Sequence, residues 1–417
     1  MASSRAPGRR HAKRARPGLA DSQAALSGSP PLHWRDWASL TAGPTGLIAE
    51  RALSNDVADY IRFRAVCTAW RACAADPRAS GLPDHRYHPR RWIMLPRANT
   101  FLNVHTGKRV DVRLPNLRRH RMLGRIAGGL LVLCHKGTHV VQLLNPVTGQ
   151  LTDLPRVTEL LPPGNMKRST DSRARAARRV RLRSGGVADD STVALVCNDG
   201  RTLAVAKPGD DDWTRLWPDG GDDRDELWTD DERILLVLPL AGRLYCVTNW
   251  NILVVETAAN HKAQLVAVAD VKSCGYPWHN DYVYPVYDDE GGLILVHRCT
   301  TSSSGFNDKY TAYRVNLATG TMEPIRGLGG QALFVCWDRS QSVFPARISS
   351  SVIADTIYVC QKGPGVEQEQ PRVVASDFSG AYTETTFDEW DIANYLSRYH
   401  KQNWVCSFAP ASPRIRP

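Results

Sequence analysis

Two kinds of hydrophobic pattern divide the chain. Between residues 57 and 73, apolar side chains recur three or four positions apart, which is the spacing of one face of an α-helix. From about residue 90, short apolar runs alternate with turn residues, as in β-strands joined by tight turns. The sequence therefore predicts a small helical module followed by a larger all-β domain.

The helical module is expected over residues 32–76. Gly43 and Pro44 disfavour helix at its start, so a first helix is predicted only after them, over residues 47–53. Asn55 or Asp56 is expected to cap a second helical run, because a short polar side chain can accept the free N-terminal amides. A block of this length buries too little surface to be stable alone. It should therefore pack on the rest of the chain or on a partner.

Ten short apolar runs are expected to be strands, with no helix between them. They are Trp92–Leu95, Leu130–Cys134, Val193–Cys197, Ile234–Leu238, Leu244–Val247, Ile252–Val255, Leu293–His297, Tyr310–Val315, Ala332–Cys336 and Ile357–Cys360. Strands at such regular intervals predict an all-β domain.

A five-residue pattern, Asn-x-x-Thr-Gly, occurs three times. The copies are 103–107, 145–149 and 316–320, each between two apolar runs, so each is predicted to be a hairpin turn. The first two lie 42 residues apart, and the gap before the third is close to four such steps. A period of about 40–45 residues is typical of β-propeller blades. The fold class is therefore mainly β with a small all-α N-terminal module, and residues 90–406 are predicted to form six or seven blades.

The net charge of +11 is concentrated in two segments. A basic tail over residues 1–31, and the basic run 167–183 within a loop over 156–190, are both expected to be disordered. An acidic loop is expected over 209–232, a linker over 77–89 and a short tail over 407–417. The two loops are either solvated, or they attract each other or charged partners. The remaining charge is near neutral, so nucleic-acid binding is not expected.

No catalytic signature occurs in the sequence. His135 and His139 flank a predicted turn, and the other histidines show no metal-ligand spacing. We therefore expect no enzyme, no cofactor, no metal and no catalytic residue. No apolar run approaches the length of about 20 residues that a membrane span needs, and no signal peptide is expected. We therefore predict an intracellular protein of the nucleus or cytoplasm. The basic residues within 9–16 form either a nuclear-import patch or part of a solubilising tail.

The chain resembles plant F-box proteins of the KIB type, which carry an N-terminal F-box and a C-terminal β-propeller domain. The resemblance covers about residues 32–377. The segments that carry it are Trp34–Trp37 (WRDW), Gly46–Leu53 (GLIAERAL), Asn55–Arg71 (NDVADYIRFRAVCTAWR), His88–Leu95 (HPRRWIML), Phe101–Gly107 (FLNVHTG), Leu143–Pro155 (LLNPVTGQLTDLP), Gly242–Thr248 (GRLYCVT) and Leu328–Val335 (LGGQALFV).

The resemblance implies a function as an adaptor. In the family, the F-box docks on a Skp-type adaptor and through it on a cullin, while the propeller holds a protein substrate of the ubiquitin ligase. An apolar helical face would enter a hydrophobic groove of the adaptor. By position, the residues predicted to face the adaptor are Leu40, Leu47, Ile48, Leu53, Val57, Tyr60 and Ile61. The residues predicted to form the core of the box are Val66, Cys67 and Trp70.

The chain departs from the family at the opening of the box. There, the family has Leu-Pro followed by an acid and two leucines, whereas Leu40 precedes the segment 41–46 (TAGPTG). Two hypotheses therefore stand. The protein is the substrate receptor of a Skp–cullin–F-box ubiquitin ligase, or it is a β-propeller interaction protein with a degenerate F-box and no ligase role.

Overall fold

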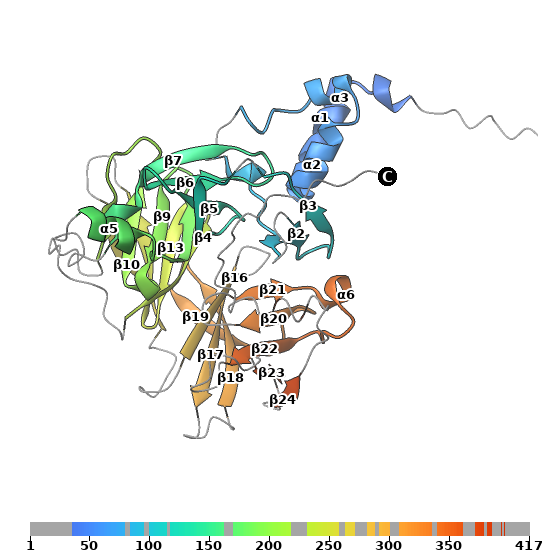
Figure 1. Ribbon diagram of the computed structural model, residues 1–417. Coiled ribbons are helices and arrows are strands. Elements are labelled where there is room, and N and C mark those ends of the chain that lie inside the picture. Colours follow the sequence, from blue (N-terminus) through green and yellow to red (C-terminus); the bar gives the residue numbers. More distant parts are fainter. Residues whose placement is uncertain are drawn as a thin grey trace, which may run out of the picture.

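In the computed structural model, the chain forms a β-propeller with a helical module on one side (Figure 1). The structure describes residues 36–79, 84–95, 100–114, 117–161, 170–217, 232–257, 263–271, 282–287, 292–300, 308–335, 340–361, 372–378, 382–385, 393 and 396. The predicted tails 1–31 and 407–417 lie outside these residues, as does most of the predicted acidic loop.

The helical module consists of a 3₁₀ turn, η1 (Trp37–Ser39), and the helices α1 (Ala42–Asn55), α2 (Val57–Arg64) and α3 (Thr68–Ala72). The prediction that Gly43 and Pro44 precede the first helix is wrong, because both lie inside α1. Proline is tolerated in a first helical turn, where its missing N–H has no intrahelical acceptor. The buried Thr45 adds a hydrogen bond from its Oγ1 to the Thr41 carbonyl oxygen, at 2.8 Å.

Six sheets among the described residues form six blades, which confirms the predicted propeller. Blade 1 is β1 (Trp92–Met94), β2 (Thr100–Asn103) and β3 (Arg109–Asp111); blade 2 is β4 (His120–Arg125), β5 (Leu131–His135), β6 (Val140–Leu144) and β7 (Leu151–Arg156); blade 3 is β8 (Leu182–Val187), β9 (Val193–Cys197), β10 (Thr202–Ala206) and β11 (Thr214–Leu216). Blade 4 is β12 (Ile234–Leu240), β13 (Arg243–Thr248), β14 (Asn251–Glu256) and β15 (Gln264–Asp270); blade 5 is β16 (Tyr282–Tyr287), β17 (Leu293–Thr300), β18 (Asp308–Asn316) and β19 (Thr321–Ile325).

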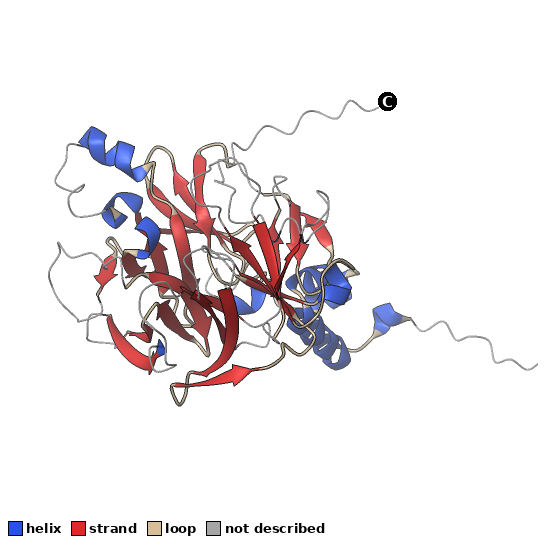
Figure 2. Ribbon diagram, turned by 90° about the horizontal axis from the view of Figure 1, so that it is seen from below, coloured by secondary structure: helices blue, strands red, loops and turns tan. Residues whose placement is uncertain are grey.

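Blade 6 contains β20 (Ala332–Val335), β21 (Gln341–Val343), β22 (Thr356–Gln361), β23 (Arg372–Ser376) and β24 (Tyr382–Thr385), with β20 and β22 parallel. Each of the ten predicted apolar runs overlaps a strand. The smaller elements are η2 (His85–Tyr87), η3 (Val157–Leu160), η4 (Asn198–Gly200), α5 (Thr170–Ala177) and α6 (Pro345–Ile348). Figure 2 shows the larger helices at the edges of a body made of strands.

Buried hydrophobic clusters join every neighbouring pair of blades. Five of them link blades 1 and 2, 2 and 3, 3 and 4, 4 and 5, and 5 and 6. The sixth joins Phe334 and Tyr358 of blade 6 to Ile93 and Leu102 of blade 1. Because burial of apolar surface is the main favourable term in folding, these six contacts close and stabilise the ring.

The Asn-x-x-Thr-Gly pattern forms the same turn three times, between the last two strands of blades 1, 2 and 5. In each copy the Asn side-chain oxygen accepts the N–H groups two and three residues later, and the glycine has φ of +69°, +74° or +70°. Glycine adopts this conformation without steric cost. The predicted turn is confirmed, but the predicted step is wrong. Asn145 and Asn316 lie three blades apart rather than four, because segments are inserted between the blades.

Part of the predicted basic loop is folded onto the propeller. Arg121 in β4 donates to the carbonyl oxygens of Ala177 and Val180, at 2.8 and 3.0 Å. Ala177 and Val180 are buried in the cluster between blades 2 and 3. The expectation of a disordered basic segment without a helix is therefore wrong for residues 170–183.

Candidate functional site

Asp56 fastens the helical module to blade 1. One carboxylate oxygen caps α2 by accepting the N–H of Ala58 at 2.6 Å, which confirms Asp56 as one of the two predicted caps. The other oxygen accepts hydrogen bonds from Nε1 of Trp92, at 2.8 Å, and from Nδ2 of Asn103. Trp92 and Asn103 are both buried. Since hydrogen bonds to a charged acceptor are stronger than neutral ones, this carboxylate is one strong attachment of α2 to the propeller.

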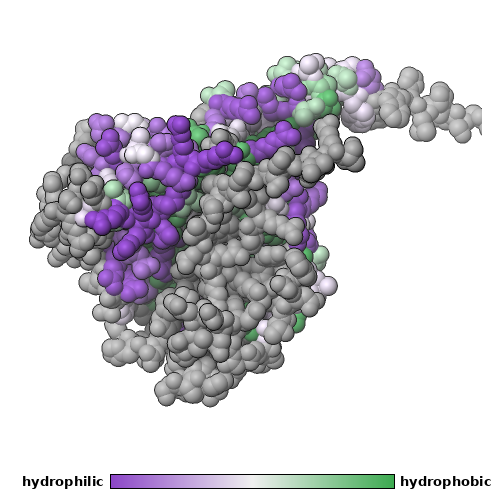
Figure 3. All heavy atoms as spheres, viewed as in Figure 1, coloured by the Kyte–Doolittle hydropathy of each residue, from purple (hydrophilic) through white to green (hydrophobic). Residues whose placement is uncertain are grey.

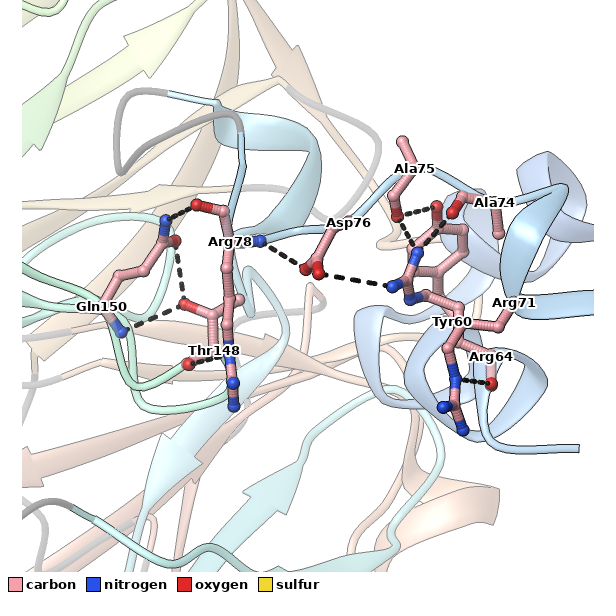
Figure 4. A network of polar contacts seen from close by, with 9 residues as sticks. All are labelled: Tyr60, Arg64, Arg71, Ala74, Ala75, Asp76, Arg78, Thr148 and Gln150. Atoms are coloured by element: carbon pink, nitrogen blue, oxygen red, sulfur yellow. Dashed lines mark hydrogen bonds and ion pairs between the residues drawn. The ribbon is translucent and has the colours of Figure 1, made fainter. Parts of the chain in front are cut away.

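A second set of polar contacts connects the helices to blade 2 (Figure 4). Arg64 forms an ion pair with Asp76 at 3.5 Å, and Asp76 accepts the N–H of Arg78 at 2.9 Å. Nε of Arg78 donates to the Thr148 carbonyl oxygen at 3.2 Å, and the Arg78 carbonyl oxygen accepts from Nε2 of Gln150 at 2.8 Å. The chain after α3 is therefore tied to the turn of blade 2.

The Asn-x-x-Thr-Gly turns of blades 1 and 2 both form hydrogen bonds with the chain N-terminal to the propeller. Asn103 reaches Asp56 through its amide nitrogen, and Asn145 donates in the same way to the Tyr87 carbonyl oxygen at 3.0 Å. Both asparagines are buried, whereas Asn316 in the third copy is exposed. One turn therefore serves both to close a hairpin and to hold the segment that packs on it.

The inner face of the helical module is an aromatic cluster. Val57, Tyr60, Phe63 and Tyr87 are buried together, and the rings of Tyr60 and Tyr87 lie 5.7 Å apart. The hydroxyl of Tyr60 donates to the Ala75 carbonyl oxygen at 2.8 Å. Burial, together with the hydrogen bond to Tyr87, raises the pKa of Tyr60 to about 12.

The outer face of the module carries exposed hydrophobic side chains. Among the described residues, seven large hydrophobic side chains are exposed, and four of them lie in the module: Trp37, Leu47, Ile48 and Val66. Leu47 is 68% exposed and, with Ile48 and polar residues of α1 and α2, lines a shallow groove of about 690 Å³. Figure 3 shows hydrophobic residues at the surface of the module. The exposed large hydrophobic side chains of the described residues are therefore concentrated in the helical module.

The seven side chains predicted to face a partner lie in three environments. Leu47 and Ile48 are exposed, Leu40, Leu53 and Ile61 are half-buried, and Val57 and Tyr60 are buried. The prediction is wrong for Val57 and Tyr60, which are each only 3% exposed and pack in the cluster with Tyr87. The reason is the cap: Asp56 is bonded to blade 1, so the start of α2 turns its apolar side inward.

The three residues predicted to form the core of the box also differ from one another. Val66 is 60% exposed, so its assignment to the core is wrong. The ring of Trp70 stacks on Phe63 at 4.7 Å, and its Nε1 donates to the Trp37 carbonyl oxygen at 2.9 Å. Sγ of Cys67 accepts the N–H of Trp70 at 3.4 Å at the start of α3. Cys67 and Trp70 therefore make their contacts within the module.

A cavity of about 500 Å³ near the propeller axis is lined by residues from all six blades. Its described charged residues include Arg125, Arg183 and Asp189, and Asp189 pairs with His85 of the linker at 3.1 Å. A pocket of this size suits a small ligand or a peptide segment. The sequence did not predict this cavity, because its lining residues lie in or beside apolar strands whose pattern indicates only a buried core. It also missed the role of Trp92, although this tryptophan begins the first strand.

Among the described residues, no group of three or more His, Cys, Asp or Glu side chains is arranged to hold a metal ion. Within the same part of the chain, no helix is long and apolar enough to cross a membrane.

Comparison with known proteins identifies the propeller. The profile of the KIB1-4 β-propeller family matches residues 101–385, and no curated protein matches the chain. Virginiamycin B lyase from Staphylococcus aureus is similar over 66% of this chain and 73% of its own, at 12% identity and a TM-score of 0.30. The GH74 enzyme of Niastella koreensis is similar over 70% and 44%, at 12% identity and a TM-score of 0.33. The N-terminal domain of Nup159 is similar over 70% of this chain and 74% of its own, at 10% identity and a TM-score of 0.21. Likenesses this low carry no argument about function.

Proposed function

The chain belongs to the KIB1-4 β-propeller family, and from this premise we propose that it is the substrate-recognition subunit of a Skp–cullin–F-box ubiquitin ligase. The propeller supports a protein-interaction role and would hold the target protein. The helical module would dock on the Skp-type adaptor, and through it on the cullin. Ubiquitin transfer belongs to the partner subunits, so this chain needs no catalytic residue and no cofactor, and we place it in the nucleus or cytoplasm.

The exposed apolar face of the helical module is the observation that carries this proposal. Leu47 and Ile48 are side by side on α1, away from the buried cluster that packs on the propeller. Full burial of such a side chain is worth about 1.5–3 kcal/mol, and a partner's groove would recover the part that corresponds to the exposed 68% of Leu47 and 39% of Ile48. An amphipathic helix laid in a hydrophobic groove is a common recognition mode.

The alternative is a β-propeller interaction protein whose helical module recruits no ligase. It is favoured by the segment 41–46 (TAGPTG), which lacks the acid and the two leucines of the family pattern and places Gly43 and Gly46 on α1. A Cβ built on either glycine meets no atom within 4 Å, so the helix surface is bare at these two positions. The two hypotheses differ in whether the remaining apolar side chains suffice for docking.

A pull-down of the purified chain with a Skp-type adaptor tests the proposal. Leu47→Asp with Ile48→Asp is expected to abolish capture. The matched control is Ile353→Asp with Val266→Asp, since these propeller residues are 66% and 37% exposed, close to the 68% and 39% of the first pair. Capture of the control but not of the double variant supports the ligase role. Failure of the intact, folded protein to capture the adaptor leaves the alternative.

A further inference from the structure

A ridge of positive charge lies at the end of blade 2 formed by the start of β4, the β5–β6 turn and the end of β7, next to the end of α5. It consists of eight exposed cationic side chains, which we call the basic ridge: Arg118, Arg119, Lys136, Arg156, Arg175, Arg178, Arg179 and Arg181. They come from the start of β4, the turn between β5 and β6, the end of β7 and the region of α5. Figure 3 shows a broad hydrophilic surface over this part of the propeller.

Contacts between these elements bring the cations together. Nζ of Lys136 donates to the Arg118 carbonyl oxygen at 2.8 Å, which joins the β5–β6 turn to the start of β4. In the same turn, the His139 carbonyl oxygen accepts the N–H of Val157 at 2.8 Å, next to Arg156. The pKa of His139 is lowered by burial and then by the nearby guanidinium groups, with that of Arg178 foremost. Arg156 and Arg178, which are distant in the sequence, therefore both lie near the β5–β6 turn.

The basic ridge is also built into the fold. Arg121 bonds the carbonyl oxygens of Ala177 and Val180, and this fixes the end of α5 on blade 2. A guanidinium at a helix C-terminus is favourable, because it meets the negative end of the helix dipole. Nη1 of Arg181 bonds back to the Arg178 carbonyl oxygen at 3.4 Å. Holding several like charges this close costs free energy, which an anionic ligand would offset.

We propose that the basic ridge binds an acidic segment of a partner protein, rich in Asp and Glu. This deepens the propeller half of the proposed function and rests on it, with the acidic segment belonging to the target. Nucleic acid fits less well. The described segments that carry the ridge, 117–121, 135–139, 154–157 and 174–182, contain no Phe, Trp or Tyr, so they offer no such ring for a base to stack on. Outside the basic tail and the basic loop the net charge of the chain is near neutral, so composition gives no support for a basic surface that follows a phosphate backbone.

Binding of a labelled peptide of about 20 residues, half of them Glu, to the full-length chain tests the proposal by fluorescence anisotropy at low salt. We expect Arg178→Glu with Arg179→Glu to weaken binding at least tenfold. Lys309→Glu with Arg326→Glu reverses two exposed cations on or just after strands of blade 5 and is expected to change binding less than twofold. Circular dichroism of both double variants shows whether each remains folded.

Equal weakening by the two double variants would overturn the proposal, because binding would then follow net charge and not the basic ridge. Tighter binding of duplex DNA or of anionic lipid vesicles than of the peptide would overturn it in favour of those ligands. The adaptor pull-down on the same proteins separates the two proposals. Arg178→Glu with Arg179→Glu should lose the peptide and keep the adaptor. An intact chain that binds the peptide but no adaptor refutes only the ligase role.

Discussion

Replacing Asp56 by alanine tests how the helical module is held on the propeller. The carboxylate ends α2 at its N-terminus and accepts hydrogen bonds from Trp92 and Asn103 of blade 1. Alanine removes all three bonds at once. It also leaves the two donors of blade 1 buried without their acceptor, since their residues are only 4% and 3% exposed.

The magnitude follows from these separate losses. Removal of an N-cap costs about 1 kcal/mol. Each buried donor left without an acceptor costs about 1–3 kcal/mol. Asp56→Ala is therefore expected to lower the free energy of unfolding by about 3–7 kcal/mol, a large share of the total for a domain.

Urea denaturation followed by circular dichroism measures this loss. Asp36→Ala is the matched control, because Asp36 caps η1 through the N–H of Ala38 at 3.1 Å but is exposed and touches no blade. The control is expected to lose less than about 1 kcal/mol. A loss for Asp56→Ala no larger than that of the control would refute the fastening of the module through this carboxylate.

Three further predictions concern the ring, the aromatic cluster and the basic ridge. Gly107 and Gly149 both have positive φ, but only at Gly107 would a Cβ strike the backbone of α6, the helix between β21 and β22 of blade 6. Gly107→Ala should therefore lower the melting temperature more than Gly149→Ala, and equal losses would contradict closure of the ring at that point. Because burial raises the pKa of Tyr60 to about 12, its contribution is present below pH of about 10 and is lost as the pH rises to about 12, and urea titrations should show Tyr60→Phe losing less stability over that range. Arg178→Gln removes a neighbouring cation and should raise the pKa of His139 in an NMR titration, whereas an unchanged value would place that arginine elsewhere.

The strands and turns of the propeller were predictable because their signals are local. An apolar run bounded by turn residues fixes a strand without reference to the rest of the chain. The hydrogen bonds that define the Asn-x-x-Thr-Gly turn are likewise local, since Asn103 accepts the N–H groups of His105 and Gly107 within the same five residues. The count of blades between the second and third copies was not local, because it depends on the lengths of inserted segments such as the one containing α5.

The direction of the helical faces could not be read from the sequence. Val57 and Tyr60 share an apolar face, but the spacing does not say whether a partner or the propeller covers it. The answer lies in the contact of Asp56 with Trp92, which is 36 residues away. Similarly, Val66 has the composition of a core residue but stands exposed just after α2, where the chain turns into α3.

The affinity of the full-length chain for a Skp-type adaptor, measured by titration calorimetry, tests the central claim most directly. Leu47→Ala removes most of an exposed anchor, so the account predicts binding about tenfold weaker or more. Ile353→Ala, at a similarly exposed position on blade 6, is predicted to leave the affinity unchanged. Absence of binding by the intact chain, or equal affinities for both variants and the parent, would contradict the claim that the outer face of the helical module docks on the adaptor.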